Sequence, residues 1–159
     1  MNDQVPEEKP QQGLEIISIY TKDISFESPS SPAIFQTNAD DKRPEAKINI
    51  EVATVAVGEQ VYECVLKLTV TAKIGEKNAY LVEIQQAGIF GLAGFKDEEL
   101  NQMTGIYCPN VLLPFARESI ADLVRRGGFP QLLIKPINFE ALYKQQQEAA
   151  QTQQGNATH

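Results

Sequence analysis

The fold is decided by the stretch VYECVLKLTVTAKI, residues 61–74. Every second residue from Tyr62 to Ile74 is apolar, whereas the residues between them are mostly charged residues or Thr. Successive side chains of a β-strand point to opposite faces, so this alternation predicts one long strand. The single polar face is typical of an antiparallel sheet with one side in the core and one in water.

Working outward, the same alternation predicts three more strands, over residues 14–26, about 48–52 and 79–86. Ile48 and Ile50 alternate with polar residues, and Tyr80, Val82 and Ile84 do so after the turn at 75–78. The connections at 58–60 and 75–78 are short, so we expect the last three strands to form a meander.

Glycine alternates with large apolar residues over residues 87–95. This segment lacks the Gly-Lys-Ser/Thr of a phosphate loop and the spacing of a dinucleotide fingerprint. Two alternatives remain, a buried loop whose glycines allow close packing, or a flexible loop that presents apolar side chains to other proteins. We favour the second, in which Ile89, Phe90, Leu92 and Phe95 lie near the surface.

Helical spacing follows the glycine segment. A short helix is predicted over residues 97–103, and a longer one carries an apolar stripe. The stripe consists of Leu113, Ala116, Ile120 and Leu123. It could cover the sheet or pack against a second copy of the chain. Asn138 is a plausible N-cap of a last helix that carries Phe139 and Tyr143.

Composition excludes several classes of function. The 159 residues carry a net charge of −7, which disfavours binding to nucleic acid. The single histidine is His159, so we expect no histidine-based catalytic or metal site, no cofactor and no enzymatic activity. Cys64 and Cys108 are the two cysteines; they could form a single long-range bridge, but we expect two buried free thiols. No targeting segment or membrane-spanning run is evident, which favours a cytoplasmic protein.

The two ends of the chain are polar. We expect residues 1–13 to be a disordered tail, residues 14–143 to form one domain, and the Gln-rich residues 144–159 to fray. Inside the domain, Asp23, Glu27, Glu63 and Glu83 project from strands. These carboxylates could simply keep the sheet soluble, or they could form a docking face for a cationic partner.

Several strings then appear in one order along residues 14–143. They are YTKDISFE (20–27), EIQQAGIF (83–90), YCPN (107–110), PFARE (114–118), GFPQ (128–131) and PINF (136–139). Together they resemble the signature of SecB, the bacterial protein-export chaperone family. Six separate strings in family order are far more specific than any one of them.

The resemblance implies an α+β fold, in which a four-stranded antiparallel sheet carries a long helix and a C-terminal helix on one face. It implies a homotetramer, a dimer of dimers, with the long helix and its stripe at the interface between dimers. It further implies an ATP-independent chaperone that binds unfolded precursor proteins and hands them to the SecA ATPase. The zinc known in this system belongs to the tail of SecA and not to this chain.

The resemblance also assigns residues. The positions that match the client groove are Ile48, Ile50, Ile89, Phe90, Leu92, Phe95, Phe139 and Tyr143. The positions that match SecA docking are Asp23, Glu27 and Glu83. Two alternatives remain beside export, a chaperone of the same fold dedicated to a toxin–antitoxin client and a purely structural oligomer.

Overall fold

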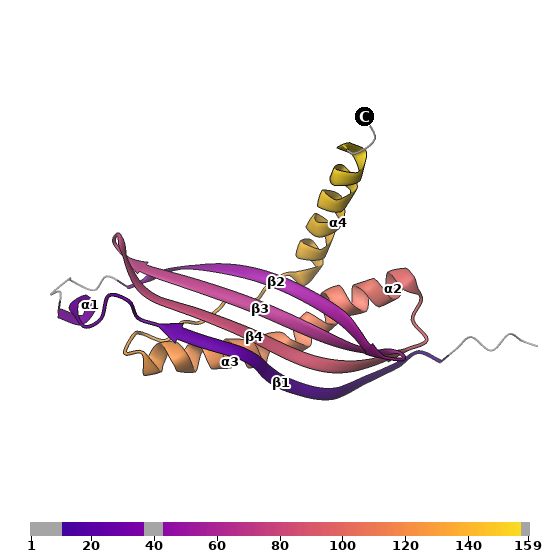
Figure 1. The fold of residues 1–159 in the computed structure, drawn as a ribbon, viewed down its shortest axis with the longest axis horizontal. Helices are drawn as coiled ribbons and strands as arrows, with labels where there is room; N and C mark the ends of the chain where they lie inside the picture. The colour runs from indigo at the N-terminus through magenta and orange to yellow at the C-terminus, as the bar shows by residue number, and fades with distance from the viewer. Residues whose placement is uncertain (1–10, 37–42, 157–159) are drawn as a thin grey trace, which may run out of the picture.

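The computed structural model of the protein describes residues 11–36 and 43–156. Four antiparallel strands form one sheet in the order β1-β4-β3-β2. Their bounds are β1 Gly13–Glu27, β2 Glu45–Gly58, β3 Val61–Ile74 and β4 Lys77–Ala93. Strands β2, β3 and β4 are joined by tight turns as a meander, and the first strand, β1, lies at the sheet edge beside β4 (Figure 1).

The two faces of the sheet differ in what covers them. We call the face that carries the even-numbered residues of β3 the helix side, because those residues, from Cys64 to Ala72, are completely buried. The opposite face, the open side, carries Glu63, Lys67 and the other odd-numbered residues of β3, most of which are partly exposed. The strand predicted over 61–74 and the assignment of its two faces are thus confirmed.

Helices follow the sheet in the chain. Their bounds are α1 Ala33–Gln36, α2 Asp97–Gln102, the π-helical turn η1 Met103–Tyr107, α3 Cys108–Arg126 and α4 Phe139–Asn156. Helix α3 lies along the helix side of the sheet (Figure 1). Its side chains that are buried include Leu112, Ala116, Ile120 and Val124, which form one core cluster with Leu68 and Ile84 of the sheet. The α+β fold is confirmed.

The glycine segment is part of a strand and not the flexible surface loop that we favoured. Residues 87–93 continue β4; residues 87–91 pair with both β1 and β3, and Leu92 and Ala93 pair with β1. Phe90 is completely buried and Leu92 is 2% exposed. A Cβ atom at Gly88 would lie 2.8 Å from the Phe90 ring and 3.0 Å from Leu112, so glycine is needed here for close packing. The alternative of glycines that permit close packing therefore holds, but within a strand.

The apolar stripe of the long helix faces the sheet of the same chain. Ala116 and Ile120 are completely buried and Leu113 is 6% exposed, whereas Leu123 is partly buried. Of the two alternatives, covering the sheet is the one that the packing supports for these residues. Leu113, Ala116 and Ile120, which we predicted at an interface between dimers, are thus covered by the sheet of the same chain.

Helix α4 begins beside β2 and then stands away from the body (Figure 1). Asn138 caps it, as predicted, because its Oδ1 accepts a hydrogen bond from Ala141 N at 3.0 Å. The helix continues to Asn156, past Lys144, where we expect fraying, and residues 144–155 are exposed. The predicted disordered tail at 1–13 falls mostly on residues 1–10, outside the described residues. Over the described ranges no helix is long and apolar enough to cross a membrane.

Candidate functional site

A groove runs on the helix side between β2 and the chain from Leu132 into α4. One of its cavities, about 530 Å³, is lined from β2 by Ala46, Ile48 and Ile50 and from the other wall by Leu132–Asn138, Ala141 and Leu142. A second cavity, about 320 Å³, is lined by Ile50, Val52 and Thr54 and by Leu142, Tyr143 and the next turns of α4. The two cavities share Ile50 and Leu142, so they form one continuous groove.

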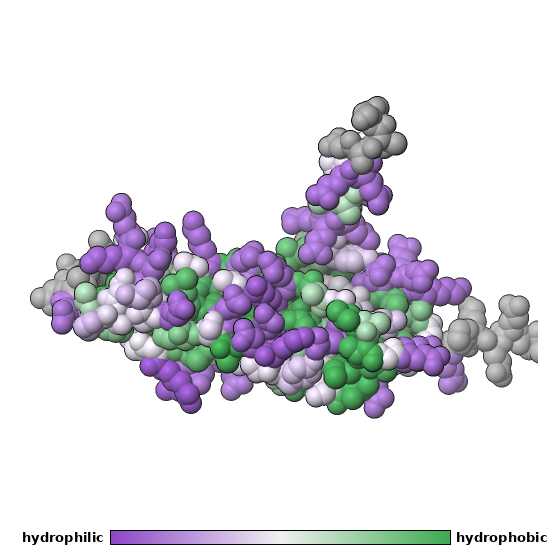
Figure 2. Space-filling view, viewed as in Figure 1, coloured by the Kyte–Doolittle hydropathy of each residue, from purple (hydrophilic) through white to green (hydrophobic). Residues whose placement is uncertain are grey.

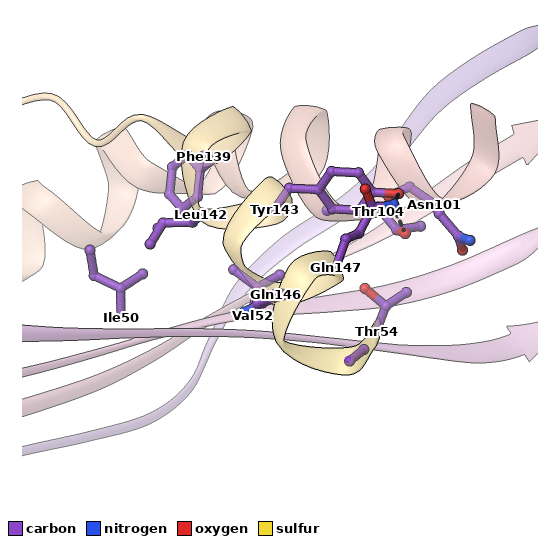
Figure 3. Close-up of a pocket in the computed structure, with 12 residues that line it drawn as sticks. Ile50, Val52, Thr54, Asn101, Thr104, Phe139, Leu142, Tyr143, Gln146 and Gln147 are labelled. Atoms are coloured by element: carbon purple, nitrogen blue, oxygen red, sulfur yellow. Dashed lines mark hydrogen bonds between the residues drawn. The ribbon is translucent and has the colours of Figure 1, made fainter. Parts of the chain in front are cut away.

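Local packing holds α4, the helical wall of the groove, in place. The Tyr143 ring lies over η1, and a Cβ atom at Gly105 would come within 2.7 Å of it. The Tyr143 hydroxyl accepts a hydrogen bond from Gln147 Nε2 at 2.9 Å (Figure 3). Phe139 is 1% exposed and anchors the first turn of α4 to the core. The groove therefore has one wall of strand and one wall of helix, with aromatic rings at the base of the helix.

The structure brings together four of the eight residues predicted for the groove. Ile48, Ile50, Phe139 and Tyr143 all line it. Phe95 lines a separate cavity of about 320 Å³ beside α2 and η1. Phe90 and Leu92 are core residues, and Ile89 lies on the open side, since it pairs with Glu63 of β3.

Other groove residues were missed by the sequence reasoning. Val52 continues the alternation of Ile48 and Ile50, which was a usable signal. Leu133 is 73% exposed and comes from the extended stretch before α4, where no periodicity distinguishes a groove wall from a simple linker. Thr104 comes from the π-helical turn, which the sequence does not reveal.

The predicted docking residues lie together on the open side. Across β1 and β4 the register pairs Asp23 with Gln85, Ser25 with Glu83 and Glu27 with Leu81. Paired residues of neighbouring strands share a face, so Glu83 lies diagonally between Asp23 and Glu27. We call Asp23, Glu27 and Glu83 the acidic triplet. The groove and the acidic triplet thus lie on opposite faces of one sheet.

Two lysines on the open side are paired with carboxylates. Lys67 Nζ lies 3.8 Å from Glu83 and 3.9 Å from Glu51. Lys22 Nζ lies 2.7 Å from Glu63 Oε1, and the Tyr20 hydroxyl donates a second hydrogen bond to Glu63. The bonds from Lys22 and Tyr20 lower the pKa of Glu63. The hydrogen bond between Tyr20 and Glu63, together with burial, raises the pKa of Tyr20 to about 12. Glu63 therefore stays ionised and Tyr20 stays protonated near neutral pH.

Cys64 and Cys108 are buried free cysteines, as predicted. The Cys64 thiol lies 3.7 Å from the Thr104 carbonyl oxygen. A hydrogen bond with Cys64, together with burial, raises the pKa of the Cys108 thiol. A thiol kept protonated in this way packs as a small apolar group between β3 and α3.

Comparison with known protein families covers nearly the whole of this domain. The family model described as preprotein translocase subunit SecB matches residues 7–150. The chain belongs to the SecB family. The resemblance drawn from the six strings is thereby confirmed, and SecB membership makes the chain a protein-export chaperone.

Curated SecB relatives are similar over nearly their whole length. The protein-export protein SecB of Nitrosococcus oceani is 50% identical over 151 residues, 95% of this chain and 92% of that protein. The SecB of Methylococcus capsulatus is 46% identical over 95% of this chain and 96% of that protein. A solved SecB-like chaperone of Mycobacterium tuberculosis, in complex with an antitoxin peptide, shares the fold with a TM-score of 0.64 at 16% identity, over 78% of this chain and 90% of that one.

Proposed function

We propose that this chain is a cytoplasmic, ATP-independent holdase that binds unfolded precursor proteins in the groove between β2 and α4 and delivers them to the SecA ATPase. The observation that carries the proposal is the continuity of the two groove cavities through Ile50 and Leu142. A groove made of two joined cavities, of about 530 Å³ and 320 Å³, suits an extended chain, and a folded client would not enter it.

The chemistry of the groove supports binding without sequence specificity. The walls of the cavity beside Ile48 are mainly aliphatic, whereas the second cavity adds polar side chains such as Asn101, Thr104 and Gln147. Leu133 is 73% and Ile48 is 37% exposed before any client binds. Burying such a side chain against a client contributes roughly 1.5–3 kcal/mol when burial is complete. Many modest contacts of this kind would give useful affinity for any chain rich in apolar residues, which describes most unfolded proteins.

The acidic triplet supports a separate partner on the opposite face. We propose that Asp23, Glu27 and Glu83 dock the basic, zinc-bearing tail of SecA. Because the groove lies on the helix side and the triplet on the open side, a client and SecA could occupy one subunit together. A delivery function requires such a ternary complex.

We further propose that the protein acts as a tetramer, a dimer of dimers. Apolar side chains remain 43–50% exposed along β1 at Leu14, Ile16, Ile17 and Ile24, and Phe115 of α3 is 45% exposed. Figure 2 shows an apolar area on the part of the molecule where β1 begins. Helix α3 covers its own sheet with Ile120, so Phe115 and the β1 residues are the ones we propose for contacts between subunits.

Replacing Ile48 and Leu133 by Ser tests the groove, with Val57→Ser as matched control. Val57 is 54% exposed on the same strand as Ile48 but lines neither groove cavity. We expect the double variant to bind a denatured, fluorescently labelled polypeptide about tenfold more weakly, since each side chain contributes roughly 1.5 kcal/mol or less of partial burial. The control should bind like the wild type.

Equal binding by the double variant and the control would place the client elsewhere. Equal binding of the denatured polypeptide and its folded form by the wild type would contradict a holdase. The second candidate function is a chaperone dedicated to one toxin–antitoxin client, because the solved SecB-like chaperone is in complex with an antitoxin peptide. That candidate requires one peptide to outcompete all unrelated denatured chains.

A further inference from the structure

Strand β1 contains a bulge beside the acidic triplet. Thr21 pairs with Gln86 and Asp23 pairs with Gln85, so Lys22 is an extra residue with no partner in the register. A bulge breaks the alternation of faces. Asp23 faces the open side with Gln85, and Lys22 also reaches the open side, because its Nζ contacts Glu63 there. A lysine and the first residue of the acidic triplet are therefore neighbours on one face.

Such a neighbour works against a docking face for a cationic partner. An ammonium group beside Asp23 would cancel much of its charge and repel a basic peptide. The structure shows Lys22 engaged elsewhere, with its Nζ 2.7 Å from Glu63 Oε1 on β3, the second strand over. Over the described ranges, neither Asp23 nor Glu27 makes an ion pair, so both carboxylates stay available.

Glu63 is itself held in a defined position. Its side chain is 16% exposed, whereas that of Lys22 is 45% exposed, so Glu63 is the fixed member of the pair. The Tyr20 hydroxyl donates to the same carboxylate. Tyr20 and Glu63 come from β1 and β3 on either side of β4, and together they place a carboxylate where the Lys22 side chain can reach it.

We propose that Glu63 is a positioning residue for partner docking: it holds the Lys22 ammonium away from Asp23 and so leaves the Asp23 carboxylate unneutralised, whereas Glu83 of the same triplet is paired with Lys67. This inference rests on the docking function proposed above for the triplet. Glu63 does not touch the partner itself, and Tyr20 supports it. The pair Lys22–Glu63 thus affects docking through charge placement on the open side, in addition to any contribution to the stability of the sheet.

The experiment compares four variants in binding to purified SecA at low salt: Glu63→Gln, Lys22→Gln, the double variant, and Asp23→Asn. Glu63→Gln keeps the shape and a hydrogen-bond acceptor for Tyr20 but frees Lys22. We expect binding to weaken roughly threefold to fivefold, the size of one exposed charge pair, mostly through slower association. Lys22→Gln should bind at least as well as the wild type. The double variant should match Lys22→Gln, because no ammonium remains to be held.

The outcomes separate the two proposals. If Glu63→Gln weakens binding equally with Lys22 present and absent, Glu63 contacts the partner directly and the inference is wrong. If Asp23→Asn weakens binding but Glu63→Gln does not, docking stands and the positioning role is wrong. If Asp23→Asn has no effect, the docking function itself fails. Thermal unfolding of each variant shows whether a loss of binding comes from a loss of stability. A purely structural role of Glu63 predicts that Lys22→Gln does not restore the binding of Glu63→Gln.

Discussion

Strand β2 and its neighbours present two contrasting surfaces. On the helix side, Ile48, Ile50 and Val52 form the strand wall of the groove, opposite α4. On the open side, Lys67 of β3 pairs with Glu51 of β2 and with Glu83, the β4 member of the acidic triplet. The period of two in a strand thus gives one sheet two surfaces of opposite chemistry, one mainly apolar and one charged.

The largest effect is expected where both surfaces depend on the same support. Ile120 is completely buried between α3 and the sheet, so Ile120→Asp would bury an unpaired charge. We expect a loss of about 3 kcal/mol or more in the free energy of unfolding, with both client and SecA binding abolished. Urea unfolding followed by circular dichroism measures it.

Phe115→Asp is the matched control on the exposed side of the same helix, where Phe115 is 45% exposed. It should cost about 1 kcal/mol or less in stability while lowering the mass in solution below that of a tetramer. If Ile120→Asp instead yields folded dimers or monomers, α3 packs differently from what we describe.

An intermediate effect is expected from salt, which should separate the two surfaces. Raising NaCl from 0.1 M to 1 M shortens the Debye length from about 10 Å to about 3 Å. Binding of SecA to the acidic triplet should weaken by about tenfold or more, whereas binding of a denatured polypeptide to the groove should hold or strengthen. Titration calorimetry or anisotropy at both salt concentrations measures this, and parallel weakening of both partners would contradict the division into two surfaces.

The smallest effect concerns the charge network on the open side. Hydrogen bonds from Lys22 and Tyr20 lower the pKa of Glu63 in the folded protein. The resulting stabilisation is complete above the pKa of an unfolded Glu, about 4.3, and is lost as the pH falls through the lower pKa of folded Glu63. The difference in unfolding free energy between the wild type and Glu63→Gln should therefore be constant above about pH 5 and shrink in acid. A pH-independent difference would mean that Glu63 contributes through packing alone.

Periodicity predicted the sheet well and its ends poorly. Residues 61–74 match β3, because a half-buried strand requires apolar and polar residues to alternate along the sequence. The predicted end of β4 at Gln86 is seven residues short of Ala93. Glycines at 88 and 91 are typical of loops, and only the neighbouring strands β1 and β3 show that this backbone is paired on both sides. Local composition carries no information on such distant partners.

Only four of the eight predicted groove residues line the groove, again because the sequence does not show which elements cover the sheet. Apolar residue type at Phe90 and at Ile48 looks alike in the sequence, yet Phe90 is completely buried and Ile48 is 37% exposed. What separates them is the position of α3, which covers the centre of the sheet and leaves the β2 edge to the groove. The acidic triplet was easier, because Asp23 and Glu27 share a face by strand parity and Glu83 lies on the polar face of β4.

The sequence by itself determined the strands, the sheet side that is wet, the acidic character and the family. These follow from short-range periodicity and from strings of neighbouring residues. Only the tertiary structure decided which apolar residues are core and which line the groove, that the stripe of α3 faces its own sheet, and that Lys22 of β1 meets Glu63 of β3 across β4. Each of these depends on contacts between residues far apart in the chain, whose pairing is set by the packing of the whole domain.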